Sequence, residues 1–378
     1  MTRGTDLPED QPNPVLLRSP RIVFPRRLLL RLHIWTGLTA GLVLSYVALS
    51  GAAMVFRQQF DPARRRGPVA IAPGARRLAL DELVRDAVAF HHSSRPDFIR
   101  YGDTVDKPVL VHFADRELAF LDPTTGAVLH DEIRHTRLFA AIEQIHRFQF
   151  IPAGDLIAGT CALTAILMIA TGACLVWPRT FRAFAAIFAL GRGRSERFPY
   201  LRAHKAVGIC VGAIVLTSAA TGLPQAFDWA RLGIYRLTGS PPAVIPVGST
   251  GADRPWLPME RFAQIAERAV PRAQLTTIHL PVKGLVSCVI IGPDAPNPNA
   301  GTLLYLDAVT GAEVGFSPYA QSSLGYKIGS WLLSVHVGQV GGMAGQLVLF
   351  LGAVGAPTLF VTGVASYFRR NRPASATQ

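Results

Sequence analysis

Four long apolar runs constrain the fold of this chain more than any other feature of its sequence. They cover residues 34–56, 156–177, 206–227 and 343–368, and none of them contains a charged side chain. A helix of about 20 apolar residues crosses the hydrocarbon core of a bilayer, so each run is long enough to span a membrane. We therefore predict an α-helical membrane protein with four transmembrane helices.

Two polar stretches of domain size interrupt the runs, one after the first span and one after the third. Amphipathic and alternating segments within them predict an inserted α+β domain in each place. The predicted order is an N-terminal segment (1–27), span 1 (28–56), domain 1 (57–147), span 2 (148–177), a basic linker (178–205), span 3 (206–227), domain 2 (228–331), span 4 (332–368) and a tail (369–378).

The distribution of charge predicts how the spans are oriented. The net charge of the 378-residue chain is +13, and most of the excess lies in the N-terminal segment, the linker and the tail. Segments rich in Lys and Arg next to spans remain in the cytoplasm, so both termini and the linker are expected there and both domains outside. Basic residues that flank spans favour contact with anionic lipid over nucleic acid. We therefore expect a lipid bilayer, and no nucleic acid, among the partners.

The sequence also contains an internal repeat. The two copies of its longest motif are His33-x3-Gly37-x3-Gly41-x8-Ser50-Gly51 and His204-x3-Gly208-x3-Gly212-x8-Thr221-Gly222. An Asp-x2-Thr-Gly-Ala segment that begins at Asp122 in the first domain recurs at Asp307 in the second, where it suits a turn closing a hairpin. We predict two parallel repeats of a span, a domain and a span, related by an axis along the membrane normal.

Four histidines lie where the apolar runs begin, and the topology sorts them into two pairs. His33 and His204 are expected near the inner face, and His146 and His336 near the outer face. Two imidazoles that face each other from neighbouring helices can bind haem iron from both sides. The glycines of the repeat would leave room for a flat macrocycle, or would allow close packing of helices; they are Gly37, Gly41, Gly208 and Gly212.

Other interpretations of polar residues near the spans stay open at this point. A histidine at a membrane interface can also bind lipid headgroups or cap a helix, and a zinc site suits the widely separated pairs less well. Asp155 is expected either to accept a hydrogen bond near the outer pair or to lie at headgroup level, His135 to lie near that pair, and Met343 to pack or to act as a sulfur ligand. The remaining histidines are expected to be surface or hydrogen-bonded residues of the domains: His91, His92, His112, His130 and His279.

Taken together, these motifs resemble the PepSY-associated transmembrane family. The resemblance rests on the His-x3-Gly entry, the Thr-Gly pair late in a span and the exits Trp177-Pro178-Arg179 and Tyr367-Phe368-Arg369-Arg370, and it covers about residues 28–370. It implies that the two domains are PepSY-like. The family includes ferric-siderophore reductases of the bacterial inner membrane, such as ferrioxamine reductase, which are similar in having four spans and b-type haems. The resemblance implies that His33, His204, His146 and His336 are the axial ligands of two haem b groups.

The function expected from these features is electron transfer across the bacterial inner membrane to reduce ferric-siderophore complexes in the periplasm. Oxygen ligands of the hydroxamate type hold Fe(III) better than Fe(II), so reduction would release iron. No residue besides the haem ligands is expected to be catalytic. Some relatives carry a flavin reductase domain after the fourth span, so a separate donor, a quinol or a cytoplasmic reductase, is expected here. The alternatives are a non-enzymatic PepSY module that binds peptides or regulates a peptidase, and a general quinol-linked transmembrane cytochrome.

Overall fold

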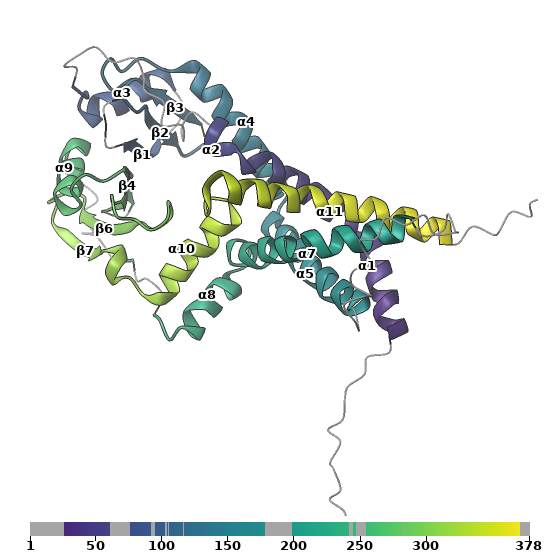
Figure 1. The fold of residues 1–378 in the computed structure, drawn as a ribbon. Helices are drawn as coiled ribbons and strands as arrows, with labels where there is room; N and C mark the ends of the chain where they lie inside the picture. Colours follow the sequence, from purple (N-terminus) through teal and green to yellow (C-terminus); the bar gives the residue numbers. More distant parts are fainter. Residues whose placement is uncertain are drawn as a thin grey trace, which may run out of the picture.

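The protein consists of a helical bundle with a β-sheet region at one end (Figure 1). The computed structural model describes residues 26–60, 76–91, 95–102, 104, 106–115, 117–177, 199–241, 245–246, 255–282 and 284–370. Most of the predicted N-terminal segment, linker and tail therefore lies outside the described residues.

Four long apolar helices form the bundle. They are α1 (Arg26–Val55), α5 (Gly154–Val176), α7 (Pro199–Ala226) and α11 (Gly342–Arg370). Each is long and apolar enough to cross a membrane, as the four apolar runs predicted. Both α1 and α7 pack against α5 and α11, so α1 and α7 occupy opposite corners of the bundle.

A turn separates two of the long helices from a shorter helix that precedes each of them. Helix α4 (His130–His146) ends before α5 begins, and α10 (Leu324–His336) ends before α11 begins. The turns contain left-handed residues, Phe148 and Ala153 in the first and Gly338, Gly341 and Gly342 in the second. Predicted spans 148–177 and 332–368 therefore started too early, because both began before the apolar runs 156–177 and 343–368, and the first residues of those runs lie close to the starts of α5 and α11. His146 and His336 end a preceding helix and do not open a span.

The two polar stretches together form one antiparallel sheet of seven strands in the order β3-β2-β1-β4-β5-β6-β7. The strands are β1 (Pro96–Gly102), β2 (Val109–Phe113), β3 (Leu118–Leu121), β4 (Leu275–Val282), β5 (Leu285–Ile291), β6 (Thr302–Asp307) and β7 (Glu313–Ser317). Strands β1 and β4 join the halves, with Ile99 opposite Ile278. The pairing covers two strand edges that would otherwise be open. The expected α+β content is present, but the expected separate domains share a sheet.

One hydrophobic core lies between this sheet and two amphipathic helices, α3 (Leu80–Phe90) and α9 (Met259–Ala269). Leu83 of α3, Phe262 of α9, Ile99 and Ile278 are fully buried in it. Side chains from both halves of the sequence thus exclude water from the same core. The shorter elements are α2 (Arg57–Phe60), α8 (Asp228–Leu237) and the 3-10 helix η1 (Tyr319–Gln321).

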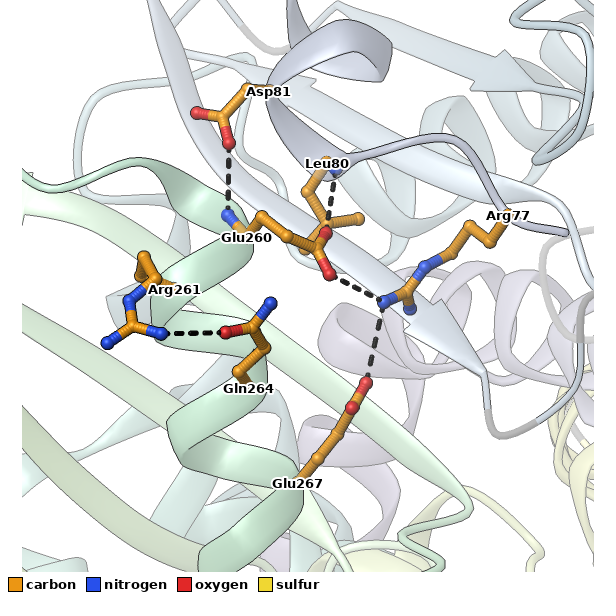
Figure 2. Close-up of polar contacts among 7 residues, drawn as sticks. All are labelled: Arg77, Leu80, Asp81, Glu260, Arg261, Gln264 and Glu267. Carbon is orange, nitrogen blue, oxygen red and sulfur yellow. Dashed lines mark hydrogen bonds and ion pairs between the residues drawn. The ribbon is translucent and has the colours of Figure 1, made fainter.

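Helices α3 and α9 cap each other (Figure 2). The Asp81 carboxylate accepts hydrogen bonds from the backbone N–H groups of Met259 (2.8 Å) and Glu260 (3.1 Å), and the Glu260 carboxylate accepts one from the N–H of Leu80 (3.0 Å). Neither helix has a side-chain cap of its own. The N–H groups that begin a helix lack partners within it, so each helix supplies the acid that the other needs. Arg77 lies between Glu260 and Glu267, at 3.7 and 3.4 Å.

The two Asp-x2-Thr-Gly segments form the turns that the sequence predicts. Oδ1 of Asp122 accepts hydrogen bonds from the N–H groups of the second and third residues after it, and Asp307 does the same. Gly126 and Gly311 both have a φ of +72°, a conformation that side-chain-bearing residues resist. These segments have a structural role, because each forms the turn that follows β3 or β6.

Candidate cofactor site

The four histidines singled out from the sequence lie at two levels of the bundle. His33 on α1 and His204 on α7 lie at the end away from the sheet, whereas His146 and His336 end α4 and α10 on the sheet side. Along α1, the helix from His33 to Ser50, which contacts His146, rises about 26 Å. The two levels are therefore separated by most of the thickness of a bilayer.

His33 and His204 face each other across the bundle. Their ring centroids are 6.1 Å apart and the ring planes are nearly perpendicular, at 84°. An imidazole nitrogen binds a transition metal at about 2 Å, so two rings on opposite sides of one metal ion have centroids about 6 Å apart. The observed separation fits a single metal ion between the two rings.

A neighbouring helix holds each of the four imidazoles by its Nδ1 atom. In all four histidines a Ser or Thr hydroxyl contacts Nδ1. In three of them a backbone carbonyl, which lies within one helical turn before that Ser or Thr, also contacts Nδ1. The contacts are His33 with Thr171 Oγ1 (2.9 Å); His146 with Val47 O (2.9 Å) and Ser50 Oγ (3.1 Å); His204 with Leu359 O (2.9 Å) and Thr362 Oγ1 (3.2 Å); and His336 with Ser218 O (3.0 Å) and Thr221 Oγ1 (3.4 Å).

These contacts determine which ring nitrogen carries the proton. A carbonyl oxygen only accepts, so Nδ1 donates in the three histidines that contact one. The Thr171 hydroxyl donates to the Leu167 carbonyl (2.8 Å), so it accepts from His33 in the same way. A neutral imidazole protonated on Nδ1 presents an unprotonated Nε2. No hydrogen bond within the described part of the chain reaches Nε2 of these four rings, which leaves this atom available as a metal ligand.

A glycine follows each of the hydroxyl-bearing residues and makes room for the edge of the ring. A Cβ atom at Gly51, Gly172, Gly222 or Gly363 would lie 3.2, 3.2, 2.8 or 3.3 Å, respectively, from Cε1 of the imidazole that the preceding residue holds. The four Ser-Gly and Thr-Gly pairs are therefore seats for the histidines, with one residue binding Nδ1 and the next leaving space.

A cavity of about 1660 Å³ lies among the helices, and all four histidines line it. Its lining extends from Arg31 and Lys205, at the end away from the sheet, to Asn299 at the sheet end. Small-molecule and cofactor sites have volumes of about 300–1,000 Å³, so this cavity is larger than a typical site for one such ligand.

The glycines of the repeat also line the cavity, and they include positions of close helix packing. The set is Gly37, Gly41, Gly208 and Gly212. A Cβ atom at Gly41 would lie 2.5 Å from Phe360 on α11, whereas one at Gly208 or Gly212 would lie at ordinary contact distances of 3.6 and 3.8 Å from its neighbours. Gly41 therefore fits the close-packing alternative, whereas a side chain at Gly208 or Gly212 would make only ordinary contacts with its neighbours.

The comparison with protein-family models identifies the chain. The model for the PepSY-associated TM region matches residues 30–370. The chain belongs to this family. The match bears out the resemblance seen in the sequence and covers all four helices of the bundle together with the sheet. A comparison with curated proteins gave no significant match.

The sheet end of this PepSY-associated protein contains two ion pairs beside the His146 and His336 pair. Arg57 pairs with Glu143 at 2.7 Å, and Arg147 pairs with Asp155 at 3.0 Å. All four charged side chains line the cavity. Asp155 therefore accepts a hydrogen bond from the arginine that follows His146 in the sequence.

The remaining residues predicted near the site have other surroundings. Met343 is 53% exposed and lies outside the described lining of the cavity, and the side chain of His135 lies outside the described residues. No group of three or more His, Cys, Asp or Glu side chains suited to a metal ion occurs in the described ranges.

The histidines of the sheet region have partners there. His91 contacts Asp115 at 2.9 Å, and His112 lies 3.5 Å from Asp97 and stacks on Phe98. His279 also contacts Phe98. These side chains are hydrogen-bonded or packed on the sheet, as expected for three of the five; the side chains of His92 and His130 lie outside the described residues.

The sequence pattern contained a signal for the seats, although it assigned them no role. Ser50 and Thr221 follow His33 and His204 at the same spacing, and Thr171 and Thr362 follow His146 and His336 at nearly the same spacing. Each of these residues follows one histidine along a span. At the far end of that span it contacts the other histidine of the same half of the sequence, so the spacing corresponds to the length of one span.

Proposed function

We propose that this protein is a dihaem b-type membrane protein that moves electrons along its bundle to reduce ferric-siderophore complexes on the sheet side. The observation that carries the proposal is the pair of rings at His33 and His204, with centroids 6.1 Å apart and both Nδ1 atoms engaged. His146 and His336, held in the same way at the sheet end, would bind the second haem.

The chain's own residues would prepare the ligands. Each Nδ1–H donates to a fixed acceptor, which orients the ring and makes Nε2 a better electron donor. Apolar side chains of the four helices form most of the lining of the cavity, and such surroundings help to set a haem's potential. Haem iron, when bound, supplies reversible one-electron transfer. The absence of a Cys-x-x-Cys-His sequence favours haem b over haem c.

The location and the partners are part of the same proposal. The proposed location is a bacterial inner membrane, and the basic residues next to the spans favour both termini in the cytoplasm and the sheet in the periplasm. A quinol or a cytoplasmic reductase would supply electrons at the end away from the sheet, and the ferric chelate would dock near His146 and His336. Reduction to Fe(II) weakens its binding by oxygen ligands.

The visible spectrum of the purified protein tests the proposal first. Protein from haem-supplied cells is expected to show two low-spin haems per chain, and His146→Ala and His204→Ala are each expected to remove one. His91→Ala, in the sheet region, serves as the matched control and should retain both. A colourless wild-type protein would overturn both redox functions and favour the non-enzymatic peptide-binding alternative.

An acceptor assay tests the substrate. Anaerobically reduced protein is mixed with a ferric hydroxamate, and haem reoxidation is followed together with trapping of Fe(II) by a coloured chelator. Rapid reoxidation with formation of Fe(II) is expected. Haem that is reoxidised by quinones but not by ferric chelates would instead support a general transmembrane cytochrome.

A further inference from the structure

A buried polar network connects the sheet to the helix that ends in His336. The loop between β5 and β6 inserts two asparagines against α10. Asn297 donates to Ser330 Oγ (3.4 Å) and accepts from the Ser334 hydroxyl (2.9 Å). Asn299 donates to Ser334 Oγ (2.8 Å) and to Gln339 Oε1 (2.7 Å). Ser334 is completely buried, and Asn297 is only 6% exposed.

The network holds the chain on both sides of His336. Ser330 and Ser334 lie one turn apart on the same face of α10, just before the histidine, and Gln339 lies in the turn just after it. Asn299 binds one residue on each side. Asn299, His336 and Gln339 line the same cavity. A buried network whose members are all hydrogen-bonded makes its surroundings rigid, so the end of α10 has little freedom to rotate.

We infer that Asn297 and Asn299 are positioning residues that set the orientation of the His336 imidazole. The inference rests on the proposed function, because orientation matters here for a ring that binds haem iron. The seat on α7 holds the ring at Nδ1 through Ser218 and Thr221, and α10 packs against α7; a second constraint acts on the residues just before and just after the ring. The two asparagines supply that second constraint from the sheet.

The described contacts beside His146 are of a different kind. Arg57 with Glu143 and Arg147 with Asp155 are partly exposed ion pairs. Salt screens exposed ion pairs, whereas it has little effect on a buried network of neutral groups. His146 and His336 are therefore held by the same kind of Nδ1 contact, but their helices are fixed differently: α4 packs directly against β3, whereas the two asparagines of the β5–β6 loop hold the end of α10.

The test uses the full-length protein with Asn297→Ala and Asn299→Ala. Electron paramagnetic resonance of the oxidised protein is expected to show a shifted signal for one low-spin haem and an unchanged signal for the haem bound by His33 and His204. The midpoint potential of the shifted haem should change as well. Asp294→Ala, an exposed position of the same loop, is the matched control and should change neither haem. Unchanged signals in both asparagine variants would overturn the inference.

Hydrogen exchange separates this inference from the proposed function. In protein without haem, amides of residues 330–338 should exchange about tenfold faster or more in the asparagine variants than in the wild type, because the buried hydrogen bonds are lost. Gln339→Ala leaves the loop intact and should also speed up exchange, although less strongly, because it removes one hydrogen bond of the network. It replaces a loop variant that fails to fold. A colourless wild type with faster exchange in the variants would overturn the haem proposal alone, and unchanged exchange would overturn the positioning role.

Discussion

At the scale of single residues, the site depends on pairs in which one side chain binds a ring nitrogen and the next residue has no side chain. Gly222 makes the tightest of these contacts, because its Cβ position lies only 2.8 Å from His336 Cε1. The hydroxyl of Thr221 and the carbonyl of Ser218 are on the same stretch of α7, so the ring cannot move away without losing its Nδ1 contacts. Gly222 is therefore needed for its lack of a side chain beside His336, and not for its backbone conformation.

Gly222→Ala is therefore expected to displace the His336 imidazole and to reduce haem content from two per chain toward one. Forcing an extra methyl group into a packed site costs about 1–3 kcal/mol, which is enough to weaken a ligand held by two hydrogen bonds. Haem per chain, measured from the visible spectrum and protein concentration, checks this. Gly329→Ala on α10, where nothing lies within 4 Å, is the matched control. Two intact haems in Gly222→Ala would show that the seat tolerates a side chain.

His112 and His279 make the stability of the sheet region depend on pH. Burial lowers the pKa of both, and Asp97 opposes the shift in part. The unfolded chain therefore binds more protons than the folded one as pH falls through about 6.5, so the free energy of unfolding decreases until the folded-state pKa values are passed. The double variant with His112→Gln and His279→Gln should show a smaller decrease between pH 7 and 5 in thermal melts of the full-length protein. Equal slopes for variant and wild type would contradict this.

At the scale of elements, α3 and α9 each have an acidic residue in the first turn that caps the N-terminus of the other helix. Asp81 and Glu260 are both the second residue of their helix, and each binds N–H groups at the start of the other. The two helices lie far apart in the sequence. The residues around the N-terminus of each helix therefore do not form an ordinary N-cap by themselves. The exchange orients both helices on the shared core.

Asp81→Ala and Glu260→Ala are each expected to lower the free energy of unfolding of the sheet region by about 0.5–2 kcal/mol, the usual cost of removing a helix cap. Amide exchange at the start of the opposite helix should speed up in each variant, α9 for Asp81→Ala and α3 for Glu260→Ala. Glu82→Ala, an exposed acid in the first turn of α3, is the control. Faster exchange only in the mutated helix would argue against reciprocal capping.

At the scale of the whole molecule, the β1–β4 pairing makes the two polar stretches one unit above the bundle. Helices α4 and α10 end at His146 and His336, so both sheet-end histidines are carried by helices that lie between the sheet and the bundle. A shared core also means that neither half can lose its packing alone.

Ile99→Ala is expected to show this cooperativity. Ile99 is fully buried at the joint, and removing such a side chain costs about 2–5 kcal/mol. Amide protection should fall in β5 of the second half as well as in β2 of the first. Val282→Ala, at a position 67% exposed at the end of β4, should leave protection unchanged. Loss of protection confined to β2 would indicate that the halves unfold separately.

The sequence alone was enough to determine the local features of this protein. The length of each apolar run predicts a span because the thickness of a bilayer is fixed, and Asp122 and Asp307 predict turns because their contacts reach only two or three residues. The four histidines could be named as candidates because a polar residue beside an apolar run is unusual. Their spacing also identified the Ser-Gly and Thr-Gly pairs as a repeated feature.

Only the tertiary structure decided what these residues contact. The hydrogen bond from His33 to Thr171 joins residues 138 positions apart, and the pairing of β1 with β4 joins the two halves of the chain. Such contacts depend on how complete helices and strands pack, and no short pattern encodes that packing. The apolar runs that begin at residues 156 and 343 locate the starts of α5 and α11 to within two residues, but they do not show that separate helices end at His146 and His336. Composition was thus enough to predict the spans. The seats of the histidines, the shared sheet and the hydrogen bonds that fix the end of α10 could be identified only in the tertiary structure.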